Sequence, residues 1–351
     1  MNKSQRRWFL ISLSLSLVVI FVMLMITIKT DTFEALKSCN PYILILALLM
    51  HIVSFCFWAL KIKLMCWSLG YPVSFIHCFN LVCSNTFLAN ITPSQVGGEP
   101  IRVYELNKAG VPGGEATAIV IMERVFDGVI LAIGTGICIF LLGWLFSDIE
   151  TQLPSGWILS AYITAGVFVG LVILFFAFSK NQKWSVNLMH KIARVITRKK
   201  PEEKQMEIKD KFEKYAVRFH KTLDHFISQS KIGLIYGMFF TILYWVNEFI
   251  IAFFICVGLG VNVHPIPRIF LLSIIFQLLI SAIMMIPLTP GSVGIAELSL
   301  GAFYASIIPV SLLGIFVLIY RLIFYYFNLA IGFIASMIIV RREVKGKKVG
   351  E

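Results

Sequence analysis

Two short segments of the 351-residue chain combine proline, glycine and charged residues within apolar surroundings. Residues 92–102 read TPSQVGGEPIR, and residues 289–297 read TPGSVGIAE. Proline ends a helix and leaves backbone carbonyls without partners, glycine allows close approach to a ligand, and arginine offers a planar fork to a phosphate. We therefore predict a substrate-binding site at Thr92, Pro93, Gly97, Gly98, Glu99, Arg102, Thr289, Pro290, Gly294 and Glu297.

Arg102 and Glu297 need partners if they lie within a membrane. An unpaired charge at the centre of a bilayer costs about 3 kcal/mol on insertion scales. For Arg102 the partner can be the phosphate of a substrate. It can also be a protein carboxylate, Glu99 or Glu297, so that the arginine holds the two segments together. The two interpretations are compatible.

Further charged residues lie in other apolar runs. Glu123, Arg124 and Asp127 are spaced to meet on one helix face, where they could pair structurally or line the entrance for a lipid headgroup. Glu248 lies nine residues before the end of its run, deep in a membrane span, and is a candidate for coupling. Arg321 lies 19 residues before Val340, which predicts a position at the outer interface beside lipid phosphate.

The composition excludes a soluble protein. Hydrophobic residues make up 58% of the chain and charged residues 14%, and the mean hydropathy is +0.84, whereas an average soluble domain carries about 25% charged residues. The net charge of +12 is typical of basic cytoplasmic loops, and no nucleic-acid partner is expected. The seven cysteines form no CxxC or Cys/His ligand pattern, so we expect no metal site, and no cofactor.

The apolar runs predict one all-α polytopic domain over residues 1–351. Six runs are long enough to cross a bilayer, and a basic amphipathic insertion, 180–231, carries 14 Lys or Arg and 6 Asp or Glu. That charge places the insertion and both termini in the cytoplasm, with the protein in the cell membrane. The six predicted crossings are 8–28, 42–60, 116–146, 157–178, 232–257 and 310–340.

The remaining runs, 75–91 and 269–308, contain proline and glycine at membrane depth and must enter and leave by one face, as re-entrant broken hairpins do. A shift of 197 residues superimposes the two regions, including TPxxVG. Three crossings separate them, so the hairpins enter from opposite faces. We predict an inverted repeat, with halves 8–146 and 157–340, whose hairpins meet at the bilayer midplane, an architecture typical of transporters.

Catalytic signatures do not appear in the sequence. No Ser/His/Asp arrangement, diphosphate–metal motif or nucleotide-binding loop is present, which favours a transporter over an enzyme. Glu99, Glu248 and Glu297 are possible proton carriers. Two alternatives remain open, a membrane-embedded transferase acting on lipid phosphates and a scaffold subunit for a separate transferase.

The segments TPSQVGGEPIR, MERVFDG and PLTPGSVGIAE resemble motifs of the lysylphosphatidylglycerol synthase transmembrane-region family. In that family the membrane part of the multiple peptide resistance factor is regarded as the flippase for aminoacylated phosphatidylglycerol, and other relatives are linked to lipid-linked glycan pathways. Ser94 and Ser292 depart from glycines frequent in the family. Because the chain stops at residue 351, without an aminoacyltransferase domain, we expect no synthase activity.

The resemblance implies a lipid flippase or transporter. Its substrate would be a phosphate-bearing lipid with an anionic or zwitterionic headgroup, either an aminoacylated phospholipid or a lipid-linked intermediate. A homodimer or a partner lipid-modifying enzyme is possible. The residues that fall on family motif positions are Thr92, Pro93, Gly97, Gly98, Glu99, Arg102, Glu123, Arg124, Asp127, Pro290, Gly294 and Glu297.

Overall fold

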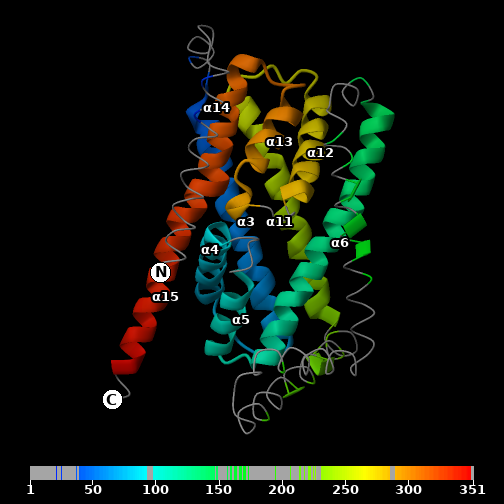
Figure 1. Cartoon of the computed structure of the whole chain (residues 1–351). Coiled ribbons are helices and arrows are strands. Elements are labelled where there is room, and N and C mark those ends of the chain that lie inside the picture. Colours follow the sequence, from blue (N-terminus) through cyan, green and yellow to red (C-terminus); the bar gives the residue numbers. More distant parts are fainter. Residues whose placement is uncertain are drawn as a thin grey trace.

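A computed structural model describes residues 39–92, 98–146, 231–284 and 289–348, with scattered positions in 21–37 and 148–226. Within the four continuous ranges the chain is helical and forms no strand (Figure 1). The elements are α3 (Pro41–Ser68), α4 (Phe75–Ile91), α5 (Gly98–Lys108), α6 (Gly113–Leu145), α11 (Lys231–Gly258), α12 (Ile266–Met284), the 3-10 turn η2 (Pro290–Ser292), α13 (Ile295–Tyr304), α14 (Val310–Arg321), the π-helical turn η3 (Leu322–Tyr326) and α15 (Phe327–Lys348).

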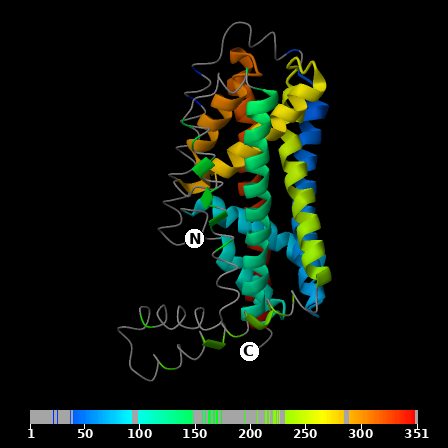
Figure 2. The ribbon, with the colours of Figure 1, turned by 90° about the vertical axis from the view of Figure 1, so that its right-hand side faces the viewer.

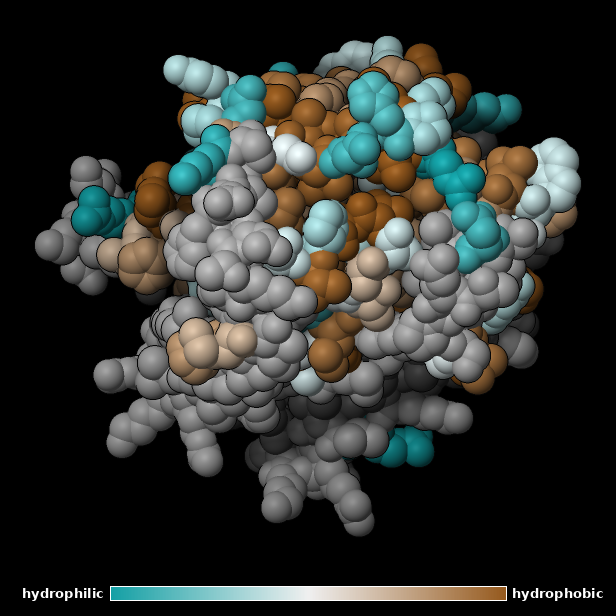
Figure 3. Space-filling view, turned by 90° about the horizontal axis from the view of Figure 1, so that it is seen from above, coloured by the Kyte–Doolittle hydropathy of each residue, from teal (hydrophilic) through white to brown (hydrophobic). Residues whose placement is uncertain are grey.

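Five stretches are long and apolar enough to cross a membrane, among the described residues: α3, α6, α11, α12 and the continuous helix from Val310 to Arg342. Their outer faces carry exposed large apolar side chains such as Ile133, Phe140 and Phe239, as lipid contact requires. The prediction of an all-α multi-pass membrane protein is confirmed. The end view shows hydrophilic side chains lying among and around hydrophobic ones (Figure 3).

The individual crossings agree with the prediction in part. α3, α6, α11 and the helix from Val310 correspond to the predicted crossings 42–60, 116–146, 232–257 and 310–340. Predicted crossings 8–28 and 157–178, and the insertion 180–231, lie outside the described residues apart from scattered positions. Within the predicted hairpin 269–308, α12 is by itself long and apolar enough to cross a membrane, so its length does not distinguish a hairpin from a crossing.

Local signals set the helix ends. The side chain of Asn40 accepts a hydrogen bond from the Tyr42 N–H (3.0 Å), which caps α3. At the end of α4, the Thr92 hydroxyl donates to the Leu88 carbonyl (2.7 Å). α13 begins after Gly294, whose φ of 86° favours glycine, and Glu297 accepts from the Gly294 N–H (2.7 Å). In both halves TPxxVG directly precedes a helix start, at Gly98 and at Ile295.

Among the described helices, α3 and α11 share the most extensive contact, and they run antiparallel side by side (Figures 1 and 2). At one end the Asn40 N–H donates to the Gly258 carbonyl (2.7 Å). At the other end Gly233 lies so close to Ser68 that a side chain there would collide with it. Small residues thus let the two backbones approach along their whole length.

The shorter helices occupy opposite ends of the molecule. α4 and α5 lie in the lower half of Figure 1, and α12 and α13 lie in the upper half. Their interrupted ends meet near the middle, because η2 packs against the end of α4. A Cβ atom added to Gly291 would lie 3.3 Å from the Asn90 carbonyl oxygen.

Two long helices, α15 and α6, each pack closely against a helix from the other half of the sequence. α15 packs on α4, where a Cβ atom at Gly332 would collide with the Cys83 carbonyl and lie 2.5 Å from the Cβ of Phe87. α6 packs on α12, where a Cβ atom at Gly134 would lie 2.5 Å from the Leu278 Cδ1. These contacts interlock the two halves of the chain.

Gly332→Ala is expected to lower the stability of the protein in detergent by about 1–3 kcal/mol, because the added methyl group must push α15 away from the backbone of α4. A thermal unfolding curve measures the change. Gly136→Ala is the matched control, since nothing lies within 4 Å of its Cβ position, and alanine is the better helix former. Equal melting temperatures for the Gly332→Ala variant and the parent would contradict the close packing.

Candidate functional site

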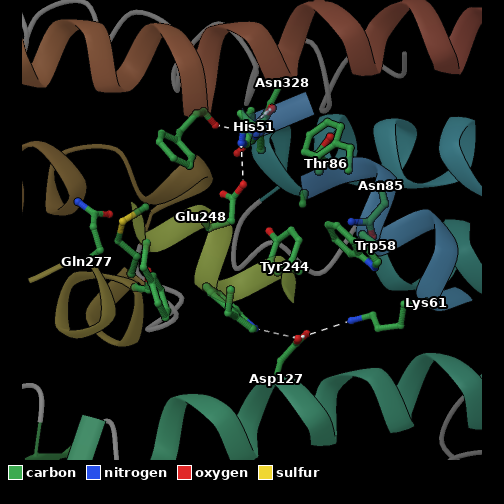
Figure 4. A pocket seen from close by; sticks show the side chains of 18 of the residues that line it. His51, Trp58, Lys61, Asn85, Thr86, Asp127, Tyr244, Glu248, Gln277 and Asn328 are labelled. Atoms are coloured by element: carbon green, nitrogen blue, oxygen red, sulfur yellow. Dashed lines mark hydrogen bonds and ion pairs between the residues drawn. The ribbon is translucent and has the colours of Figure 1, made fainter. Parts of the chain in front are cut away.

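A cavity of about 220 Å³ lies where the broken and the long helices meet (Figure 4). It is smaller than the roughly 300–1,000 Å³ pockets that take drug-sized ligands, so it suits a small polar group. Its lining is unusually polar for the interior of a membrane protein. The polar and charged lining residues are His51, Trp58, Lys61, Asn85, Thr86, Asn90, Arg124, Asp127, Tyr244, Trp245, Glu248, Gln277, Ser281, Tyr320 and Asn328.

Glu123 on α6 is the centre of a buried charge cluster on one side of the cavity. Arg102 of α5 forms an ion pair with it, and both side chains are 1% exposed. The Lys61 Nζ of α3 lies 3.4 Å from Glu123 Oε1, and the Trp58 indole N–H donates to the same oxygen (2.9 Å). One carboxylate thereby joins three helices.

Asp127, one turn further along α6, extends the cluster into the cavity. Its Oδ1 lies 3.7 Å from Lys61 Nζ and accepts from the Trp245 indole N–H (3.1 Å), and its Oδ2 lies 3.5 Å from Arg124 Nη1. Arg124 also donates to Glu99 Oε1 from Nε (2.9 Å) and Nη2 (2.6 Å). The cluster thus contains three carboxylates and three cations, and this balance limits the cost of burying them.

A second polar group crosses the middle of the bundle. His51 Nδ1 lies 2.9 Å from Glu248 Oε1, and His51 Nε2 lies 2.8 Å from Asn328 Oδ1 (Figure 4). Asn328 donates from Nδ2 to the Phe324 carbonyl (2.7 Å), so its Oδ1 must accept and His51 Nε2 must carry a proton. The Nδ1–Oε1 contact then requires one further proton, which lies on either the imidazole or the carboxyl group.

The second break contains its own buried ion pair. Arg321 Nε donates to Glu297 Oε1 (2.7 Å), and the guanidinium lies over the Tyr325 ring at 4.7 Å. Glu297 is 0% and Arg321 2% exposed. The prediction that Arg321 reaches the outer interface is therefore wrong. Its distance from Val340 could not reveal Glu297, a partner 24 residues away on the other side of a chain reversal.

The structure brings half of the predicted site residues into these clusters. Glu99, Arg102, Glu123, Arg124 and Asp127 form one connected network. Arg102 does not line the cavity, because it lies behind Trp58, with its guanidinium carbon 5.4 Å from the ring. Its carboxylate partner is Glu123, whereas the sequence suggested Glu99 or Glu297.

The other predicted residues lie at the breaks. Thr92 follows α4, Gly98 begins α5, and Pro290 begins η2. The Thr289 hydroxyl donates to the Val293 carbonyl (2.8 Å) and closes the turn. Pro93 and Gly97 lie outside the described residues. The described part contains no group of three His, Cys, Asp or Glu that could hold a metal ion.

Sequence reasoning missed His51, Lys61 and Asn328. Lys61 lies one residue beyond the predicted end of its span, yet α3 continues to Ser68 and buries it. A signal was present, since His51, Phe55, Trp58 and Lys61 recur at helical spacing and place the histidine and the lysine on one face. Asn328 offered no such signal, because its role depends on a helix far away in sequence.

Comparison with known proteins gives consistent matches along the chain. Residues 9–332 match the family described as the lysylphosphatidylglycerol synthase TM region. A UPF0104 membrane protein of Archaeoglobus fulgidus is 33% identical over 87% of this chain and 88% of its own length. UPF0104 membrane proteins of Methanocaldococcus jannaschii (26% identical, 90% of each chain) and Pyrococcus horikoshii (23%, 79% of this chain and 80% of that one) are also similar. No solved structure matches the chain.

Lys61→Met is expected to destabilise the protein by about 3–5 kcal/mol, because the buried cluster then has one carboxylate too many. The double variant Lys61→Met/Asp127→Asn restores the balance and should recover much of that loss, which a double-mutant cycle of thermal unfolding measures. Lys63→Met on the same helix is the control, since Lys63 has no place in the cluster. Additive single effects, with no recovery in the double variant, would contradict the charge balance.

Proposed function

The chain belongs to the lysylphosphatidylglycerol synthase transmembrane-region family, and from that premise we propose that it moves a phosphate-bearing lipid across the membrane as a flippase. The observation that carries the proposal is the polar cavity at the meeting point of the helix breaks, which Lys61 and Arg124 enter from opposite sides of Asp127. The headgroup would occupy this cavity while the acyl chains stay in the bilayer.

The charges around the cavity suit a phosphate that carries a nearby cation. Lys61 and Arg124 line the cavity and can bind the phosphate. Arg102, whose Nε and Nη1 have no hydrogen-bond partner among the described residues, lies behind Trp58 and pairs with Glu123. Asp127 and Glu248 can bind a positive group. An aminoacylated phospholipid has this chemistry, and a lipid-linked intermediate shares the phosphate.

The same proposal includes the inverted repeat, with α4–α5 and α12–α13 as re-entrant hairpins from opposite faces. Three observations support it. The helix starts at Gly98 and Ile295, and at Gly113 and Val310, are both 197 residues apart. α3 and α11 run antiparallel. Where they cross, His51 contacts Glu248, also 197 residues away. In a twofold repeat, two equivalent residues can contact each other only close to the twofold axis.

Orientation and coupling follow from this arrangement. The basic insertion 180–231 favours a cytoplasmic position for that segment and for both termini, in the cell membrane. The His51–Glu248 hydrogen bond lies beside the cavity, where its proton would couple lipid movement to proton transfer.

Arg124→Gln is expected to slow lipid movement at least tenfold, because the phosphate then loses a cation that lines the cavity. Proteoliposomes with fluorescent phosphatidylglycerol and its lysyl ester, assayed by quenching in the outer leaflet, measure the rate. Arg268→Gln is the control, since Arg268 forms an exposed pair with Asp148. The Arg102→Ala variant tests the sequence-based prediction that Arg102, which lies behind Trp58, contacts the phosphate.

Two results would count against a flippase. If the Arg124→Gln variant, the Arg102→Ala variant and the parent all move labelled lipid at the same rate, the proposed binding site is wrong. A lipid product of altered mass, formed by the parent in the presence of candidate donors, would instead favour the membrane-embedded transferase.

A further inference from the structure

The two halves of the chain carry an ion pair at corresponding places, with the arginines 197 residues apart and the glutamates 198. Glu99 and Glu297 both lie in the first turn of the helix that follows a break. Arg124 and Arg321 both lie eleven residues after the start of a long helix, at Gly113 and Val310. Each arginine binds the glutamate of its own half, at 2.6 Å in the first and 2.7 Å in the second.

Despite this match, the two pairs differ in their exposure to solvent. The side chains of Arg124 and Glu99 are 38% and 35% exposed, and Arg124 lines the cavity. The side chains of Arg321 and Glu297 are 2% and 0% exposed. The second pair is sealed by Gly291, whose carbonyl lies 3.4 Å from Arg321 Nη1, and by the Tyr325 ring.

The backbone differs at the same place. Directly after Arg321 the helix widens into the π-helical turn η3, Leu322–Tyr326. The residues that follow Arg124 form a regular α-helix to Leu145. π-helical turns within α-helices are frequent at functional sites, and here the turn separates the sealed arginine from Asn328, which binds His51 at the centre.

We propose that Glu297–Arg321 is the closed counterpart of Glu99–Arg124, and that the two pairs exchange burial as the protein works. In the present state the Arg124 side is open and the Arg321 side is closed. In the opposite state Arg321 faces water and can bind the lipid phosphate, while Arg124 is sealed. This inference rests on the proposed function, for which it supplies the second binding position.

Charge burial determines which state each pair favours. A buried pair is tolerated while both partners are present, but removing one partner leaves an uncompensated buried charge, which is strongly unfavourable. Substitution of Glu297 or Arg321 should therefore destabilise the present state and favour the opposite state, in which the Arg321 side is open to water. Loss of Glu99 leaves a cation that is already partly exposed, so the present state should persist.

Ser292→Cys reports on the closed side, because Ser292 is 2% exposed and follows Gly291. The measurement is the rate at which a charged maleimide labels this thiol in proteoliposomes, with Cys39 and Cys56 replaced by serine because the other five cysteines are buried. Adding Glu297→Gln should raise the rate at least tenfold, and Arg321→Gln should do the same. The matched variants Glu99→Gln and Arg124→Gln should change it less than twofold.

The double variant Glu297→Gln/Arg321→Gln separates charge burial from local loosening. It buries no charge, so its Ser292→Cys labelling should return to within twofold of the parent, and it stays informative if a single variant fails to fold. Fast labelling of this folded double variant, an equal rise with Glu99→Gln, or unchanged labelling in folded Glu297→Gln would each overturn the inference.

The labelling rate does not depend on lipid movement. If the parent moves no lipid while Glu297→Gln still opens the closed side, the flippase proposal fails and the exchange of burial stands. If lipid moves and the labelling pattern is absent, the exchange fails alone.

Discussion

A charge can stay in the apolar interior of this protein only if its counter-charge stays beside it. Carboxylates and cations cost several kcal/mol to desolvate singly, and here each buried carboxylate meets its partner across a helix boundary. Glu123 joins α3, α5 and α6, and Glu297 joins α13 to the helix from Val310. The positions of the short helices are thereby set by electrostatics as much as by packing.

The same constraint explains why the cavity lies at the centre. Two apolar cores flank it, one formed largely by α11, α12, α14 and the end of α6 and the other by α3, α4 and the start of α6. Polar side chains from both halves fill the zone between the cores, with His51 and Glu248 at its middle. In the proposed repeat this zone contains the twofold axis, so each half contributes equally to the site.

Much of this fold could be predicted from local sequence, and much of the site could not. Apolar runs and the TPxxVG pair located α3, α4, α6 and α11 because composition and helix breaking are local properties. Partner choice is not local. Its place at the end of an apolar run makes Lys61 resemble the polar flank of a span, but in the structure Glu123 and Asp127 lie beside it. Arg321 resembles an interfacial anchor in the sequence, but in the structure Glu297 lies beside it. In both cases a partner that is distant in sequence allows the charge to be buried, although the local sequence suggests a surface position.

The wide turn at Leu322–Tyr326 interrupts the regular helix that runs from Val310 to Arg342. A π turn holds one residue more than an α turn, so it accommodates an insertion without rotating the rest of the helix. A membrane span can in this way gain a residue and keep both of its ends facing their original neighbours.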